Sequence, residues 1–174
     1  MKIRLDRVRE EPFSWEEVRE IRGSDLQRVE VQSLGAVQWR GQVGPAARGF
    51  TLSARVAYMQ TLTCMRCLQP TEQSVDARVE LAILVDPTES LAEEHELTEE
   101  ELGTIILSEA VLETDPILFE QLQLNVPMKP LCRSACRGLC VICGADLNAG
   151  DCGCERNDPD PRWAALASLK RNST

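Results

Sequence analysis

The 174-residue sequence predicts an α+β fold: an antiparallel β-sheet meander with a few short helices and a cysteine-rich segment toward the C-terminus. Runs rich in Val and Thr, separated by Gly and Pro, indicate the strands. In Val75–Ile83 apolar residues occupy alternate positions, which is typical of a strand with one face in water. The third observation is that all eight cysteines gather in two regions, so they are expected to share one task.

The first half of the chain supplies the expected sheet. Residues 1–9 alternate apolar and charged side chains and predict a short strand. Phe13–Ile21 predicts a helical turn, because Ser14 suits an N-cap and Glu17 follows three residues later. Longer strands are expected at Arg28–Leu34, Ala36–Val43, Gly49–Thr63 and Glu72–Val85.

The second half is expected to carry the helices. Asp86–Glu101 is rich in Glu and predicts an acidic loop, and Leu102–Leu107 regains strand character. Thr114–Leu124 predicts a helix with Asp115 as N-cap and Pro116 as first helical residue. The break in that helix is expected at Asn125-Val126-Pro127, and a terminal helix at Trp163–Arg171 after Asp160-Pro161. The predicted domains are a sheet body over 1–131, with the Cys64/Cys67 turn and the acidic loop 86–101, and a cysteine-rich segment with the terminal helix over 132–174.

Charge is unevenly distributed along the chain. The net charge is −9, and thirteen acidic residues but no Lys or Arg lie between Val79 and Met128. This argues against a uniformly basic nucleic-acid surface. The acidic stretch is either a solvated loop or a surface that attracts a basic partner. No apolar run approaches the roughly 18 residues of a membrane span, and the N-terminus has no secretory signal pattern, so a cytoplasmic location is expected.

The cysteine spacing predicts two metal sites. In a reducing compartment stable disulfides are disfavoured, and eight thiols make two complete sets of four for tetrahedral zinc. Leu139–Gly144 has the form of a zinc knuckle, in which Gly144 allows the left-handed turn after the second thiol. The local set is Cys140, Cys143, Cys152 and Cys154. The remaining set, Cys64, Cys67, Cys132 and Cys136, would join the sheet to the segment after the helix.

Other chemistry is weakly represented. An iron–sulfur cluster, a single occupied site, disulfides and thiol redox chemistry are the alternatives for the cysteines. A site with four thiolates leaves no open position for water, so we expect structural rather than catalytic zinc. His95 is the single histidine and is expected in the acidic loop, while Trp15, Trp39 and Trp163 are expected as core or helix anchors. No phosphate-binding loop or Ser/His/Asp set stands out, so no enzymatic activity is expected.

Four motifs in this order resemble the YceD family of large ribosomal RNA subunit accumulation proteins. They are Thr63–Leu68, with its Cys-x-Arg-Cys unit, Leu124–Cys132, Cys136–Asn148 and Asp160–Lys170. The resemblance implies a bacterial cytoplasmic ribosome-biogenesis factor that supports accumulation of large-subunit (23S) ribosomal RNA. Gln123–Val126 departs from the family's usual Leu-Ala-Leu-Pro, which should alter the end of the helix and leave the sites intact.

Three functional hypotheses follow. A non-enzymatic factor would bind large-subunit ribosomal RNA precursor through basic residues near the knuckles, for which Arg66, Arg162, Lys170 and Arg171 are the candidates. An acidic holdase would escort a basic large-subunit ribosomal protein with the stretch Glu80–Glu120; the resemblance is compatible with this, because such genes often neighbour that of a small zinc-ribbon protein of the subunit. A thiol oxidoreductase is the third. No membrane partner or small-molecule substrate is expected.

Overall fold

The computed structural model describes residues 1–85, 103–154 and 162. The predicted acidic loop 86–101 with His95, the terminal helix with Trp163, and the candidate residues Lys170 and Arg171 lie outside the described residues.

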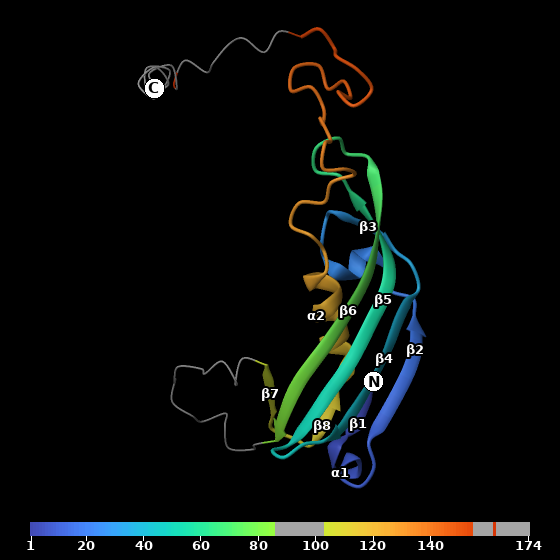
Figure 1. Ribbon diagram of the computed structural model, residues 1–174, viewed down its shortest axis with the longest axis vertical. Helices are drawn as coiled ribbons and strands as arrows, with labels where there is room; N and C mark the ends of the chain where they lie inside the picture. The colour runs from blue at the N-terminus through green and yellow to red at the C-terminus, as the bar shows by residue number, and fades with distance from the viewer. Residues whose placement is uncertain (86–102, 155–161, 163–174) are drawn as a thin grey trace.

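A six-stranded sheet forms the body of the molecule (Figure 1). Its path runs β2-β4-β5-β6-β7, and β3 pairs with the far end of β5. The strands are β2 (Phe13–Arg19), β3 (Val31–Leu34), β4 (Val37–Pro45), β5 (Phe50–Thr63), β6 (Pro70–Val85) and β7 (Thr104–Leu107). The long hairpin of β5 and β6 is paired in continuous register from Phe50↔Ile83 to Thr63↔Pro70. Its closed turn therefore lies at one end of the molecule, and that turn carries Cys64 and Cys67.

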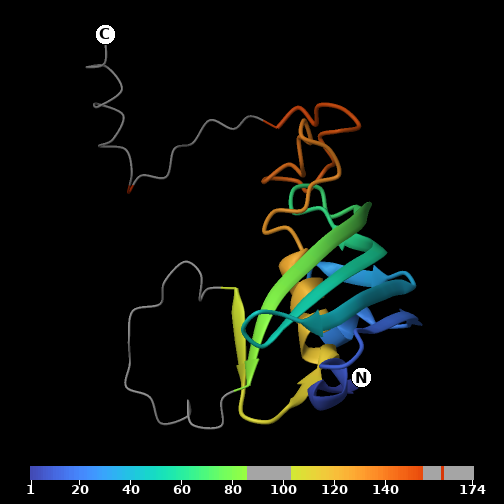
Figure 2. The same cartoon turned by 60° about the horizontal axis from the view of Figure 1, so that its bottom comes forward.

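The inner face of the sheet is covered by the remaining elements (Figure 2). These are the small sheet of β1 (Lys2–Arg4) and β8 (Val111–Glu113), the helices α1 (Leu5–Val8) and α2 (Thr114–Leu124), and the 3-10 turn η1 (Gly23–Leu26). The Tyr58 hydroxyl donates to the Leu122 carbonyl at 3.4 Å, and Gln60 Nε2 donates to the Asn125 carbonyl at 3.1 Å. Helix α2 therefore packs on the face of β5 that carries these two buried side chains.

The four long strands predicted from Val/Thr runs are present, with ends that differ by up to three residues. The β-rich fold with few short helices is thus confirmed. One pairing departs from an all-antiparallel sheet: β7 runs parallel to β6, with Ala82 opposite Thr104.

Two local predictions near the start of the chain are corrected by the structure: the first strand is shorter than expected, and a helical turn is replaced by a strand. The first strand ends at Arg4, and Leu5–Val8 turns into α1, which buries Leu5 and Val8 in the core. The predicted helical turn at Phe13–Ile21 is strand β2, paired with β4 along its whole length. A capping signal is worth about 1 kcal/mol. Seven paired positions and the packing of Trp15 against Trp39, with ring centroids 5.7 Å apart, outweigh it.

Helix α2 has the predicted range, but its start differs in detail. Glu113 occupies the N-cap position and makes no side-chain capping hydrogen bond, so Asp115 is not the cap and Pro116 is the third helical residue. Asp115 instead accepts a hydrogen bond from Arg19 Nη1 at 2.8 Å, and this pair joins α2 to β2. The helix ends at Leu124, before Asn125, as expected.

Candidate metal centre

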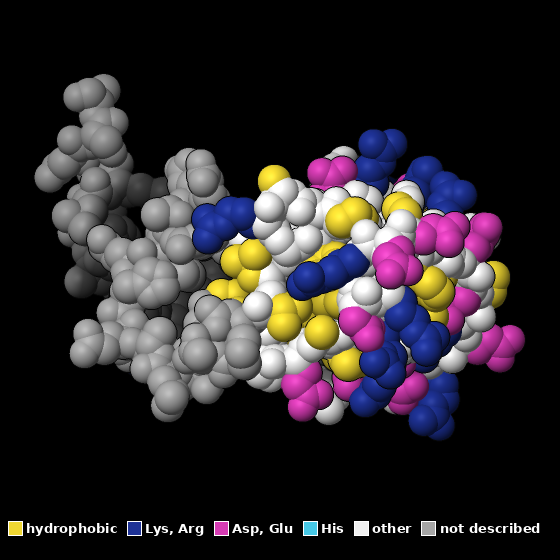
Figure 3. Space-filling model, turned by 90° about the horizontal axis from the view of Figure 1, so that it is seen from below, with side chains coloured by type: hydrophobic (Ala, Val, Ile, Leu, Met, Phe, Trp, Pro, Cys, Tyr) yellow, Lys and Arg dark blue, Asp and Glu magenta, His cyan; other side chains and the backbone are white. Residues whose placement is uncertain are grey.

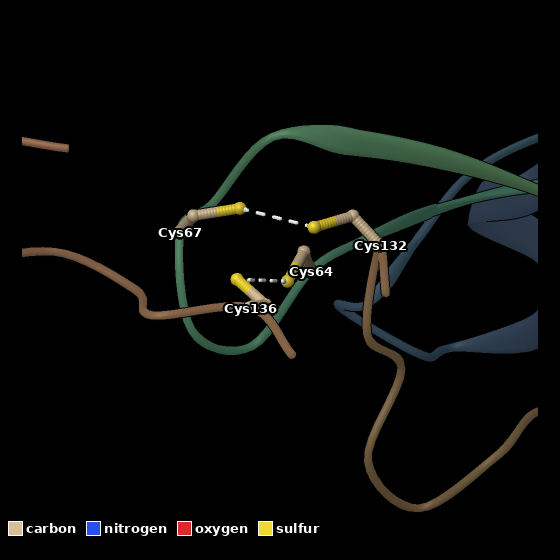
Figure 4. Close-up of side chains that lie close together, drawn as sticks. All are labelled: Cys64, Cys67, Cys132 and Cys136. Atoms are coloured by element: carbon tan, nitrogen blue, oxygen red, sulfur yellow. Dashed lines mark hydrogen bonds between the residues drawn. The ribbon is translucent and has the colours of Figure 1, made fainter. Parts of the chain in front are cut away.

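The first group of four cysteines joins the β5–β6 turn to the segment that follows α2 (Figure 4). Cys64 and Cys67 come from the turn, and Cys132 and Cys136 from the later segment. Cys64 Sγ lies 3.9 Å from Cys136 Sγ, and Cys67 Sγ lies 3.7 Å from Cys132 Sγ. A tetrahedral zinc with Zn–S bonds of about 2.3 Å would space its sulfurs by about 3.8 Å. The sulfur positions therefore match a tetrahedral thiolate site, and they are too far apart for disulfides.

The backbone of this turn has the geometry of a zinc knuckle. The amide of Leu68 donates to the Cys64 carbonyl at 2.9 Å, and the amide of Cys64 donates to the Gln69 carbonyl at 2.9 Å. This closure forces Leu68 into the left-handed region, with φ of 61°. Both thiols of the pair consequently point to one side of the turn, where Cys132 and Cys136 approach.

The second group of four is local and repeats the same turn. Gly144 donates its amide to the Cys140 carbonyl at 2.9 Å, and Cys140 donates its own to the Ala145 carbonyl at 2.8 Å. Gly144 has φ of 74°, which is the left-handed turn expected at this glycine. The Ile142 amide points at Cys140 Sγ at 3.4 Å. Together with Cys152 and Cys154, the two thiols of this turn bring four sulfurs within 4.8 Å of one another.

Arg66 holds the two segments of the first group together. Its guanidinium donates to the Cys136 carbonyl at 2.8 Å, and its own carbonyl accepts the amide of Leu139 at 3.0 Å. Gly138 makes this approach possible, because a Cβ there would lie 2.8 Å from the Arg66 carbonyl oxygen. The residue proposed from the sequence as an RNA contact thus has a structural task, although its side chain remains exposed.

The two groups differ in burial. Cys64, Cys67 and Cys136 are buried, and Cys132 is exposed. In the second group Cys140 is buried, Cys152 and Cys154 are half-buried, and Cys143 is exposed.

In each group the pKa of at least one thiol is lowered and that of at least one other is raised. Burial works against ionisation of Cys64, but amides of Cys67, Cys132 and Arg66 that donate to the sulfur lower its pKa to about 6. Amides of Cys143 and Ile142 lower the pKa of Cys140 to about 6 in the same way. Burial and the neighbouring sulfurs raise the pKa of Cys132 to about 12, and neighbouring sulfurs and burial do the same for Cys154.

These pKa values indicate what each group can bind. Four thiolates within 4.8 Å repel one another, so the pKa values of Cys132 and Cys154 are high even though hydrogen bonds lower those of Cys64, Cys136 and Cys140. A divalent cation supplies the positive charge that holds all four ionised. The donor set, its spacing and its electrostatics therefore fit a metal ion at each group.

Asn148 was missed by sequence reasoning and links the two groups. Its Nδ2 lies 3.5 Å from Cys136 Sγ, and its Oδ1 accepts from Arg133 Nη2 and from the Arg137 amide, both at 2.9 Å. The available signal was the spacing Asp146-x-Asn148, which is typical of an Asx turn; the Asn148 amide donates to Asp146 Oδ1 at 2.9 Å. Of the other predicted RNA contacts, Arg162 is the one that the structure describes.

The fold and sites define a class: a small β-sheet protein that carries two groups of four cysteines at one end of the sheet. Residues 52–170 match the family described as large ribosomal RNA subunit accumulation protein YceD, and the chain belongs to this family. The match includes all eight cysteines.

The chain is also similar to several curated proteins. Uncharacterized proteins of Mycobacterium tuberculosis and Mycobacterium bovis are each 30% identical over 133 residues, which is 74% of this chain and 59% of theirs. The chain thus spans about three fifths of the length of these relatives. A protein of Arabidopsis thaliana named large ribosomal RNA subunit accumulation protein YCED homolog 1, chloroplastic, is 38% identical over 47 residues, which is 27% of this chain and 15% of that protein. No solved structure matches the chain. Among the described residues, no helix is long and apolar enough to cross a membrane.

Proposed function

We propose that this protein is a non-enzymatic ribosome-biogenesis factor that supports accumulation of large-subunit (23S) ribosomal RNA in the cytoplasm. The observation that carries the proposal is the family match over 52–170, which spans β5, β6, α2 and both cysteine groups. The family's name describes accumulation of an RNA and states no reaction. We propose that the eight cysteines bind two Zn²⁺ ions with a structural role, since a complete set of four thiolates leaves no position for a reacting water.

The partner is either the large-subunit RNA precursor or a basic ribosomal protein of that subunit. A basic cluster favours RNA: Lys129, Arg133 and Arg137 lie on the segment around the cysteines, to which Arg66 is bonded, although Arg137 pairs with Asp151. The acidic stretch favours the protein, but within the described part of it Glu113 pairs with Lys2 and Asp115 pairs with Arg19. Part of that negative charge is therefore neutralised within the molecule.

The test is to deplete the protein in the organism whose genome encodes it and to measure the ratio of 23S to 16S ribosomal RNA. We expect the ratio to fall on depletion and to recover with a plasmid copy of the wild-type chain. A copy carrying Cys64→Ser and Cys136→Ser should fail to restore it, while Arg48→Gln, at an exposed hairpin position, should restore it fully. An unchanged ratio on depletion would refute the proposal.

The escort alternative makes a different prediction in the same cells. Affinity purification of the tagged chain at low salt would recover one free basic ribosomal protein in stoichiometric amount, without RNA. Recovery of ribosomal RNA precursor that is lost on ribonuclease treatment would instead favour direct RNA binding.

A further inference from the structure

Three arginines lie side by side across the centre of the sheet. Arg40 on β4 is directly opposite Arg55 on β5, and Arg55 is directly opposite Arg78 on β6. Neighbouring strands are about 4.8 Å apart, so the row crosses the sheet as a short ladder of positive charge. Like charges placed directly opposite one another destabilise a sheet. The packing of the fold gives no reason for such a row.

The row lies on the outer face of the sheet, which no described element covers. The residues next to each arginine in its strand point the other way and are buried: Trp39, Val56 and Val79 are at most 4% exposed. Helix α2 lies on that inner face, as its bonds to Tyr58 and Gln60 show. Arg40 and Arg78 are exposed, and Arg55 is half-buried.

Two of the three arginines have no ion-pair partner among the described residues. Arg55 is bonded through its guanidinium to Asp76, which lies two residues before Arg78 on β6. Arg40 and Arg78 make no such bond, although Glu16 stands opposite Arg40 on β2 and Glu80 follows two residues after Arg78. The paired Arg55–Asp76 unit thus lies between two guanidinium groups whose donors are unused within the described structure.

The surface around the row is small and slightly hollowed, and it combines charged, polar and small apolar residues. A shallow depression of about 290 Å³ is lined by the three arginines, by Gln42, Ser53 and Glu80, and by Gly41, Ala54 and Val79. No aromatic side chain lines it. Guanidinium groups bind phosphate oxygens bidentately, and Ser and Gln side chains commonly donate to the same oxygens.

We propose that the Arg40–Arg55–Arg78 row binds the sugar–phosphate backbone of ribosomal RNA. This rests on the proposed function in ribosomal RNA accumulation and names the surface through which the chain would meet the RNA. A basic ribosomal protein fits this surface less well, because its lysines and arginines would face the unpaired Arg40 and Arg78. The end of the sheet away from the cysteines is a poorer candidate: Figure 3 shows basic and acidic side chains intermixed there around hydrophobic ones.

The test uses the full-length, zinc-loaded chain and a transcript of 23S ribosomal RNA in a filter-binding assay over a range of salt. The double variant Arg40→Glu/Arg78→Glu reverses both unpaired charges, and Arg40→Gln/Arg78→Gln removes them without adding acid. Arg48→Glu is the matched control, because this exposed arginine belongs to the β4–β5 turn and lies off the row. Circular dichroism and zinc content establish that each variant is folded.

We expect the Glu double variant to bind at least tenfold more weakly and the Gln variant to fall between it and the wild type. The control should stay within twofold. Because neither double variant can neutralise the two phosphates that face Arg40 and Arg78, the slope of log K against log salt should decrease by about 1 to 2. Equal affinity of all variants would overturn the inference. A wild-type chain that leaves the transcript unbound and captures an acidic protein would also overturn it. Both results leave the proposed function standing if depletion still lowers the 23S to 16S ratio, which is measured separately.

Discussion

Leu68 and Gly144 occupy the same position in two copies of one turn. Each follows the second thiol of a Cys-x2-Cys pair and donates its amide to the carbonyl of the first cysteine at 2.9 Å. Each has a positive φ, 61° for Leu68 and 74° for Gly144. A residue with a Cβ is strained by about 1–2 kcal/mol in this conformation, and glycine is not. The first turn therefore stores strain that the second avoids.

Leu68→Gly should stabilise the protein. The side chain of Leu68 is 61% exposed, so its removal loses little burial and relieves the left-handed strain. After the entropic cost of glycine, the expected gain is about 0.5–1 kcal/mol in the free energy of unfolding. Urea denaturation of the zinc-loaded protein measures it. Leu68→Ala keeps the Cβ and is the control that should give no gain; an equal gain for Ala would mean that strain is not the cause.

The conformation of the Cys140–Gly144 turn could be predicted from the sequence, and that of the Cys64–Leu68 turn only in part. The difference lies in the residue that follows the second thiol. The glycine after Cys143 indicates a residue with positive φ, because glycine favours that conformation. Leu68 gives no such signal, and the backbone hydrogen bonds of the closed turn keep it in the same conformation. The same reason explains why β2 was predicted as a helical turn. The capping pattern of Phe13–Arg19 is a local signal, whereas the strand forms by pairing with β4, which this short stretch of sequence does not encode. The strands with strong alternation and the range of α2 could be predicted from local sequence patterns alone.

The two cysteine groups should contribute differently to folding. Cys136 is buried, and it meets Cys64 across 72 positions of the chain, so its site closes a long loop that contains β6, β7, β8 and α2. Cys143 is exposed and belongs to a site formed within Cys140–Cys154. Each of the variants Cys136→Ser and Cys143→Ser should lower zinc content from about two to one per chain. Cys136→Ser should also lower the free energy of unfolding by several kcal/mol, and Cys143→Ser should leave the sheet folded.

Metal analysis by atomic emission and hydrogen exchange of β5 and β6 amides measure these effects. Loss of protection in β5 and β6 on Cys143→Ser would contradict the local nature of the second site. If the Cys136→Ser variant retains full protection of the β5 and β6 amides, the first group of cysteines does not stabilise the sheet as proposed.

Tyr58 should make the protein sensitive to alkali. Burial raises the pKa of Tyr58 to about 12, above the value of about 10 in an unfolded chain. The unfolded state therefore ionises first, so the stability that this group contributes is complete below pH 10 and is lost as pH rises toward 12. Tyr58→Phe cannot ionise, and because the hydroxyl's bond to Leu122 is long at 3.4 Å, it should cost only about 1 kcal/mol at pH 7.

The difference in free energy of unfolding between wild type and Tyr58→Phe is the quantity to measure, at pH 7 and in steps from pH 9 to 11. It should shift in favour of the variant above pH 10. Other titrating groups cancel in this difference, so a gap that stays constant with pH would count against the burial of the hydroxyl.

Gly41 and Trp15 should be energetically coupled. A Cβ at Gly41 would lie 2.5 Å from Trp15 Cζ2 and 2.9 Å from Ala54 Cβ, so the indole occupies the space that a side chain would need. Gly41→Ala should cost about 1–3 kcal/mol in the wild type through overpacking. In a Trp15→Phe background the cost should be smaller by about 1 kcal/mol, since phenylalanine lacks the outer ring atoms. A double-mutant cycle by urea denaturation measures this coupling, and additive effects would show that Ala54 alone sets the penalty.

Arg66 should act on metal retention rather than only on RNA. Its guanidinium donates to the Cys136 carbonyl, and its carbonyl accepts from Leu139, so it positions a thiol that belongs to the long-range group. Loss of a group that orients a ligand typically weakens metal binding by about 10–100-fold. Arg66→Gln should therefore lose one zinc at a chelator concentration at which the wild type and the Arg48→Gln control keep two. Arg66→Lys keeps the charge but not the planar fork, and it should show an intermediate loss. If Arg66→Gln keeps both ions and yet binds ribosomal RNA more weakly, then the guanidinium serves the RNA and the bond to Cys136 is incidental.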